Sequence, residues 1–251
     1  MSLLEGDMAT RTIQSDRPYV AAIVTAILLV LLVGFSRSFY LLPAFGSEPD
    51  WAAKEPIFYI HGTVFTLWFA LLACQTYLVR SRSLRLHRKL GYVGAGLGVI
   101  VVVLGTYVAL RAANRAGGFM GVPFPPQQFL TVPLANMVLF ASFLTLGVIN
   151  RHKPASHKRL MLLASISLLG APIARIPLMV PQLPFWLDAL VYTAFTVAMG
   201  YWDLETRGKV RPETLYGGPA IVVLTLAALP IGSTAAWQNI ATWMMSFAGP
   251  P

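Results

Sequence analysis

The feature that most constrains this chain is a series of long apolar stretches separated by short basic loops. A bilayer core about 30 Å thick requires about 20 helical residues, because each residue of an α-helix rises about 1.5 Å. The stretches of that length are 18–36, 57–79, 90–110, 129–149, 158–179, 184–202 and 216–235. The sequence therefore predicts an all-α integral membrane protein, a bundle of seven transmembrane helices.

The composition agrees with a membrane location. Hydrophobic residues make up 56% of the chain and charged residues only 12%, whereas charged residues form about a quarter of an ordinary soluble protein. The formal net charge of +9 does not indicate nucleic-acid binding, which requires a contiguous basic face. Basic residues that gather at helix ends instead indicate membrane lipids as partners, and other membrane subunits fit the same composition.

The cationic residues also predict an orientation. Of the 19 lysines and arginines, 14 precede the first stretch or lie in alternate loops, which are residues 80–89, 151–159 and 207–211. By the positive-inside rule these loops are cytoplasmic. We therefore expect a multi-pass protein of a bacterial cytoplasmic (inner) membrane, with its N-terminus inside and its C-terminus outside.

Three regions follow from this topology. Residues 1–17 form a cytoplasmic tail, residues 18–235 form the transmembrane domain, and residues 236–251 form an interfacial segment. Pro230 and Gly232 predict a kink before that segment. Trp237 and Trp243 predict its anchoring at the membrane surface, where tryptophan is enriched.

The two largest basic loops resemble each other. With an offset of 70 residues, Val79–Leu90 aligns with Ile149–Leu160, and His87-Arg-Lys-Leu falls on His157-Lys-Arg-Leu. Both blocks stand where a helix re-enters the membrane. The second to fifth spans are therefore predicted to form a pseudo-repeated pair of helical hairpins and the packed centre of the bundle. Gly94 and Gly98 mark the third span as the closest-packed helix.

The same blocks resemble a known family. A helix that opens with His61-Gly62, the motif His87-Arg-Lys-Leu-Gly91 and the motif His157-Lys-Arg-Leu-Met161 are similar to a family of bacterial multi-pass membrane proteins of unknown function, which carries His-Arg-x-Leu-Gly and His-Arg-x-Trp-Met motifs. Here Lys158 replaces the arginine and the tryptophan is missing. The resemblance implies the architecture and no reaction.

Three polar residues are predicted to share a layer near the outer surface. His61 lies about 6 Å below the start of its helix and Arg175 about 25 Å along a helix that enters from the other side. Asp188 follows at the start of the next stretch. Charges within the hydrocarbon region are costly unless they pair or face a wet cavity. The layer is therefore either a structural Arg175–Asp188 ion pair, or a ligand pocket in which Arg175 holds an anionic group and His61 carries a proton.

A second cluster of histidines is predicted at the cytoplasmic side. His87 and His157 could ligate the iron of one haem b, or each could belong to an interfacial anchor whose cations bind lipid phosphates. The single cysteine, Cys74, offers no thiolate cage, and we predict no separate metal site.

Three functions remain open from the sequence. The first is an accessory or scaffold component of a membrane assembly, because each residue above has a structural explanation. The second is a single-haem electron-transfer protein that uses His87 and His157. The third is a transporter or enzyme for a small lipid-soluble or anionic ligand, built on His61, Arg175 and Asp188. No catalytic residue is identified, and enzymatic activity is left undecided.

Overall fold

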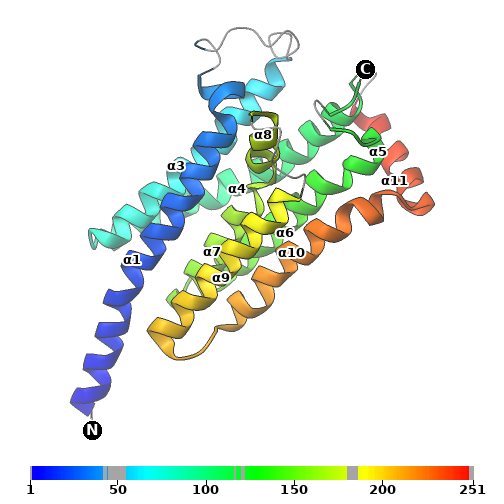
Figure 1. The fold of residues 1–251 in the computed structure, drawn as a ribbon. Helices are drawn as coiled ribbons and strands as arrows, with labels where there is room; N and C mark the ends of the chain where they lie inside the picture. Colours follow the sequence, from blue (N-terminus) through cyan, green and yellow to red (C-terminus); the bar gives the residue numbers. More distant parts are fainter. Residues whose placement is uncertain are drawn as a thin grey trace.

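The chain folds into a bundle of helices (Figure 1). This computed structural model describes residues 2–41, 44, 55–115, 117–119, 122–179 and 186–248. The longer helices are α1 (Ser2–Phe35), α3 (Pro56–Arg80), α4 (Leu84–Ala113), α6 (Thr131–Ile149), α9 (Leu187–Arg207) and α10 (Pro212–Gly232). The shorter elements are the π-helical turn η1 (Ser36–Tyr40), α5 (Pro126–Phe129), α7 (Pro154–Ser167), α8 (Gly170–Met179), α11 (Ala235–Met245) and the 3-10 turn η2 (Ser246–Ala248). The all-α prediction is confirmed.

Within the residues that the structure describes, six helical segments, not seven, are long and apolar enough to cross a membrane. They are Asp16–Tyr40, Pro56–Arg80, Leu84–Ala113, Pro126–Ile149, Pro154–Pro177 and Pro212–Gly232. The prediction of a seventh at 184–202 is wrong. Helix α9 extends to Arg207 and includes Asp188, Asp203 and Glu205, and these charges, with its tyrosines and threonines, lower its mean hydropathy. It packs within the bundle beside α1 and α10 (Figure 1).

The basic loops lie together. Residues 81–83, 150–153 and 208–211 stand at the same end of the bundle as the N-terminus (Figure 1), and we call this end the basic end. Gly208 ends α9 there with a φ of 66°, a left-handed conformation that favours glycine, and its N–H donates to the carbonyl of Leu204 at 2.9 Å. The membrane side on which the basic end lies stays a prediction.

The helix boundaries follow the repeat seen in the sequence. Helices α4 and α7 begin 70 residues apart, at Leu84 and Pro154, and the preceding helices end at Arg80 and Ile149. Each pair, α3–α4 and α6–α7, forms an antiparallel hairpin (Figure 1). These boundaries support a pair of related hairpins, although a symmetry axis between them stays a prediction.

The most buried span is the fifth and not the third, although both belong to the predicted centre. In the span that contains α7, 61% of the apolar window is buried, against 33% in α4. Small side chains allow this, because Ala164, Ser165 and Ser167 are fully enclosed and the hydroxyl of Ser165 accepts from Trp68 Nε1 at 3.2 Å. The glycines of α4 still pack closely, and a Cβ on Gly94 would lie 3.0 Å from Leu71.

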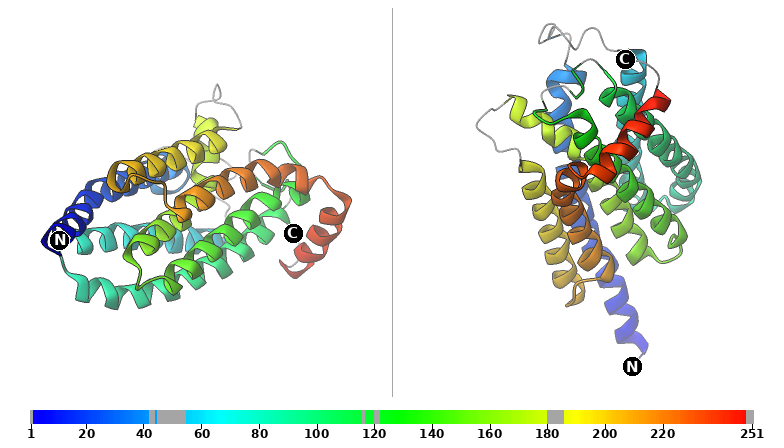
Figure 2. Two further views of the ribbon diagram at one scale, coloured as in Figure 1. Left: turned by 90° about the horizontal axis from the view of Figure 1, so that it is seen from below. Right: turned by 90° about the vertical axis from the view of Figure 1, so that its right-hand side faces the viewer.

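The C-terminal helix is set apart from α10. Helix α11 runs obliquely across the end of the bundle (Figure 2), and its N-cap Thr234 accepts a hydrogen bond from the N–H of Trp237. The indole of Trp237 donates to the carbonyl of Gln127 at 2.8 Å. Trp237 therefore packs α11 against the segment before α6, whereas Trp243 is exposed. The interfacial position of 236–251 stays a prediction.

Candidate functional site

A cavity of about 480 Å³ lies in the half of the bundle away from the basic end. All three residues of the predicted outer layer line it, His61 from α3, Arg175 from α8 and Asp188 from α9. The volume lies within the range of about 300–1,000 Å³ that is usual for small-molecule sites. The structure thus brings the three residues to one space.

The walls of the cavity are mainly apolar and aromatic. Its aromatic lining residues are Phe35, Phe39, Tyr40, Phe58, Tyr59, Phe65, Phe69, Phe119, Phe124, Phe129 and Trp186. These come from segments far apart in the sequence, which converge at this end. Such a lining suits a hydrophobic molecule, with the few polar groups left to orient it.

Two irregular stretches of backbone border the cavity. The π-helical turn η1 ends α1, and its Ser38, Phe39 and Tyr40 line the space. Helix α7 stops at Ser167, and the amide of Leu169 bonds to Ile166 O at 2.9 Å, three residues back, before α8 begins. Breaks in membrane helices are tolerated where the backbone lines a protein-enclosed cavity, and π-helical turns occur frequently at functional sites.

A glycine allows close packing of three helices beside the α7–α8 break. A Cβ on Gly170 would lie 2.5 Å from Asn136 Nδ2 and 3.1 Å from the hydroxyl of Tyr192. Any larger residue would therefore push α6 and α9 away from the start of α8. Asn136 and Gly170 both line the cavity, so the close contact between α6 and the start of α8 determines the shape of the cavity there.

The imidazole of His61 packs on an aromatic ring. Its ring stacks on Phe65, with centroids 4.1 Å apart. Its Nδ1 atom is buried and has no hydrogen-bond partner within the part of the chain that the structure describes. A buried polar atom of this kind costs free energy unless a ligand or water completes its bonding.

Arg175 is held by its own helix and by an aromatic ring. Its Nη1 donates to the carbonyl of Ala171 at 2.7 Å, and its guanidinium carbon lies 4.7 Å from the centroid of Phe35. This cation–π contact orients the side chain. Arginine in a low-dielectric site attracts carboxylate or phosphate groups strongly.

Asp188 occupies the first turn of α9. Its Oδ1 accepts from the amide of Ala189 at 2.7 Å, and burial raises the pKa of its carboxyl group. Among the ion pairs of the described residues, none joins Arg175 to Asp188. The predicted structural ion pair is therefore not formed, and both groups face the cavity.

The two motif histidines meet at the basic end. His87 on α4 and His157 on α7 have ring centroids 6.4 Å apart and ring planes at 81°. The Nδ1 of His157 donates to the carbonyl of Gly147 at 2.8 Å. The sequence repeat predicted this proximity. Whether the pair holds haem iron stays a prediction.

A fully buried ion pair near the basic end was not anticipated. Arg159 on α7 binds Asp203 on α9, and neither side chain is exposed. The Arg159 Nε–Asp203 Oδ1 distance is 2.7 Å, and the second carboxylate oxygen accepts from the amide of Arg211 at 3.0 Å. The indole of Trp202 covers the guanidinium at 4.2 Å. Arg159 therefore does not anchor to lipid phosphate.

A second acidic residue, Asp16, interacts with three donor side chains beside that pair. Asp16, which is 2% exposed, forms ion pairs with Lys158 and Arg207 and accepts from Trp202 Nε1 at 2.9 Å. Sequence inspection of Lys158 and Arg159 indicated lipid anchors because their acidic partners are distant in the chain. An acidic residue inside an apolar helix, such as Asp203, was the available signal.

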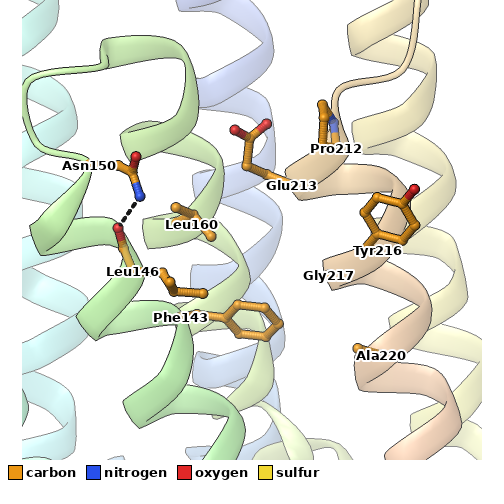
Figure 3. A pocket seen from close by; sticks show the side chains of 9 residues that line it. All are labelled: Phe143, Leu146, Asn150, Leu160, Pro212, Glu213, Tyr216, Gly217 and Ala220. Atoms are coloured by element: carbon orange, nitrogen blue, oxygen red, sulfur yellow. Dashed lines mark hydrogen bonds between the residues drawn. The ribbon is translucent and has the colours of Figure 1, made fainter.

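A second, more open cavity of about 390 Å³ lies between α6, α7 and α10 (Figure 3). Phe143, Leu146 and Leu160 form its walls, and Glu213 stands at its rim (Figure 3). The amide of Asn150 bonds to the carbonyl of Leu146 at 2.8 Å. This groove offers apolar packing surface and lacks the converging polar groups of the larger cavity.

Comparisons with known proteins identify no relative. No protein-family model, no curated protein and no solved structure matches this chain. The resemblance suggested by the His87 and His157 motifs therefore identifies no family. The chain is therefore described as a multi-pass helical membrane protein with six candidate spans.

Proposed function

We propose that the protein binds a small amphiphilic molecule with an anionic head group in the 480 Å³ cavity, as a membrane transporter or enzyme. The observation that carries this proposal is the convergence of His61, Arg175 and Asp188 on one aromatic-lined space within the bundle. Arg175 binds the head group, His61 donates or accepts a proton beside it, and the aromatic walls enclose the apolar body.

The placement of the polar residues favours a ligand over a structural pair. Arg175 and Asp188 form no ion pair with each other, and both line the cavity. Polar groups that converge on an apolar cavity are typical of small-molecule sites. His61 lines the same space, and its buried Nδ1 has no hydrogen-bond partner among the described residues, so a ligand in the cavity would complete its bonding.

Three molecules with the same ten-carbon tail test the proposal: decanoate, decanol and decylamine. Their binding to the purified protein can be followed by quenching of the tryptophan fluorescence, since Trp186 lines the cavity. We expect decanoate to bind most tightly and decylamine least. Arg175→Gln should weaken decanoate binding by about ten- to a hundredfold, the equivalent of one charge-assisted hydrogen bond, and should leave decanol unchanged.

Arg37→Gln is the matched control. Arg37 lies in the adjacent turn η1 but is exposed and does not line the cavity. Equal binding of the three molecules, or equal loss in both variants, would contradict an anion site. If the protein binds none of the three molecules, an accessory or scaffold role becomes the preferred function.

A further inference from the structure

We infer that His87 and His157 form a binding site for a single Cu(I) ion, separate from the cavity. The two histidines belong to α4 and α7, the re-entering helices of the two hairpins. Neither of the two cavities described above reaches them. The site therefore does not depend on the proposed function.

The spacing of the rings fits one bridging ion. A metal that binds one nitrogen of each imidazole at about 2.0 Å, on the line between the rings, places their centroids about 6 Å apart. The observed separation is 6.4 Å. Copper(I) accepts few ligands and favours imidazole and thioether donors, so two histidines can hold it where a four-coordinate zinc ion would need further donors.

One nitrogen of each ring is available for the ion. A carbonyl can only accept, so the bond to Gly147 fixes the proton of His157 on Nδ1 and leaves Nε2 as the basic nitrogen. Metal-binding histidines commonly have this second bond to a backbone carbonyl. The Nδ1 of His87 is buried without a hydrogen-bond partner within the described residues, which leaves it available to the ion.

A soft donor follows on the same helix. Met161 lies one turn after His157 on α7, and its sulfur would be 2.9 Å from a Cβ on Gly147, the residue whose carbonyl holds His157. A thioether ligand would favour Cu(I) over harder ions. A bis-histidine haem iron would place the rings at a similar spacing, but it also needs room for the macrocycle between them, which a single ion does not.

The test is copper retention by the full chain. Purified protein is loaded with Cu(I) under anaerobic, reducing conditions, passed through gel filtration, and measured for copper per chain. We expect one copper in the unaltered protein and none in His87→Ala or His157→Ala. X-ray absorption should show two nitrogen ligands at about 2.0 Å.

The third histidine of this region provides the control. His152 lies five residues before His157 in the exposed loop 150–153, and His152→Ala should retain copper. His157→Gln, whose amide can still donate to Gly147, tests the site if the alanine variant does not fold. Absence of copper in the unaltered protein, retention in both alanine variants, or loss in His152→Ala overturns the site. A Soret absorbance that both alanine variants lose also overturns it, in favour of haem.

Discussion

The charged residues inside the bundle have different surroundings at its two ends. At the basic end, Arg159 and Asp203 are completely enclosed and joined to each other. At the cavity end, Arg175 and Asp188 are not joined to each other and both face a space of about 480 Å³. Buried charges that pair with each other are part of the folded structure and call for no ligand. Charges that line a cavity inside a membrane protein indicate ligands or ions.

The largest effect should come from breaking the enclosed ion pair. Arg159→Met leaves the carboxylate of Asp203 buried without its main partner, which typically costs about 3–5 kcal/mol. We expect the variant to unfold at much lower denaturant concentration, as measured by circular dichroism in detergent. The double variant Arg159→Met with Asp203→Leu should recover most of the loss, because no uncompensated charge remains. A double variant as unstable as the single one would contradict the pairing.

A smaller loss is expected at Asp16. Asp16→Asn removes the charge that Lys158 and Arg207 share, and it keeps an oxygen that can accept from Trp202. The loss of charge-assisted bonds should reduce the free energy of unfolding by about 1–3 kcal/mol. Trp202→Phe, which removes only the indole donor, provides a graded comparison. Equal stability of Asp16→Asn and the unaltered protein would show that these contacts do not hold α1 to α7 and α9.

At the cavity end a substitution should affect binding more than stability. Ala174→Phe places a ring in the cavity next to Arg175, since Ala174 lines that space. We expect decanoate affinity to fall at least about tenfold, equivalent to about 1.4 kcal/mol, with a smaller change in unfolding. Ala194→Phe on the exposed side of α9 is the matched control. Unchanged binding in Ala174→Phe would place the ligand elsewhere.

The smallest effect concerns the partly exposed ion pair near the cavity. Arg111 Nε lies 2.9 Å from Glu55 Oε2, and this bond holds the pKa of Glu55 below its usual range. The stabilisation is therefore present above the usual carboxyl pKa and is lost as pH falls through the lowered value. Glu55→Gln should slightly reduce the difference in thermal midpoint between about pH 6 and about pH 3. An unchanged difference would show that solvent screens the pair completely.

The sequence predicted much of the architecture and part of the candidate site. Hydropathy located all six candidate spans, and the offset of 70 residues located the start of α4 and α7. Depth arithmetic placed His61, Arg175 and Asp188 in one layer, and they line one cavity. The prediction that α9 is a span was wrong because the predicted stretch ended before the acidic residues in the last turns of the helix.

What the sequence alone determined is what lipid demands of a chain: long apolar helices, with cationic residues gathered in alternate loops. These are local properties, set by the solvation of each side chain and readable within about 20 residues. Only the tertiary structure decided which charges pair and which face a cavity. Asp16 and Arg207 are separated by 191 residues, and no local pattern of residues specifies how α1, α7 and α9 meet. Their packing brings Asp203 to Arg159 and leaves Arg175 and Asp188 beside the cavity.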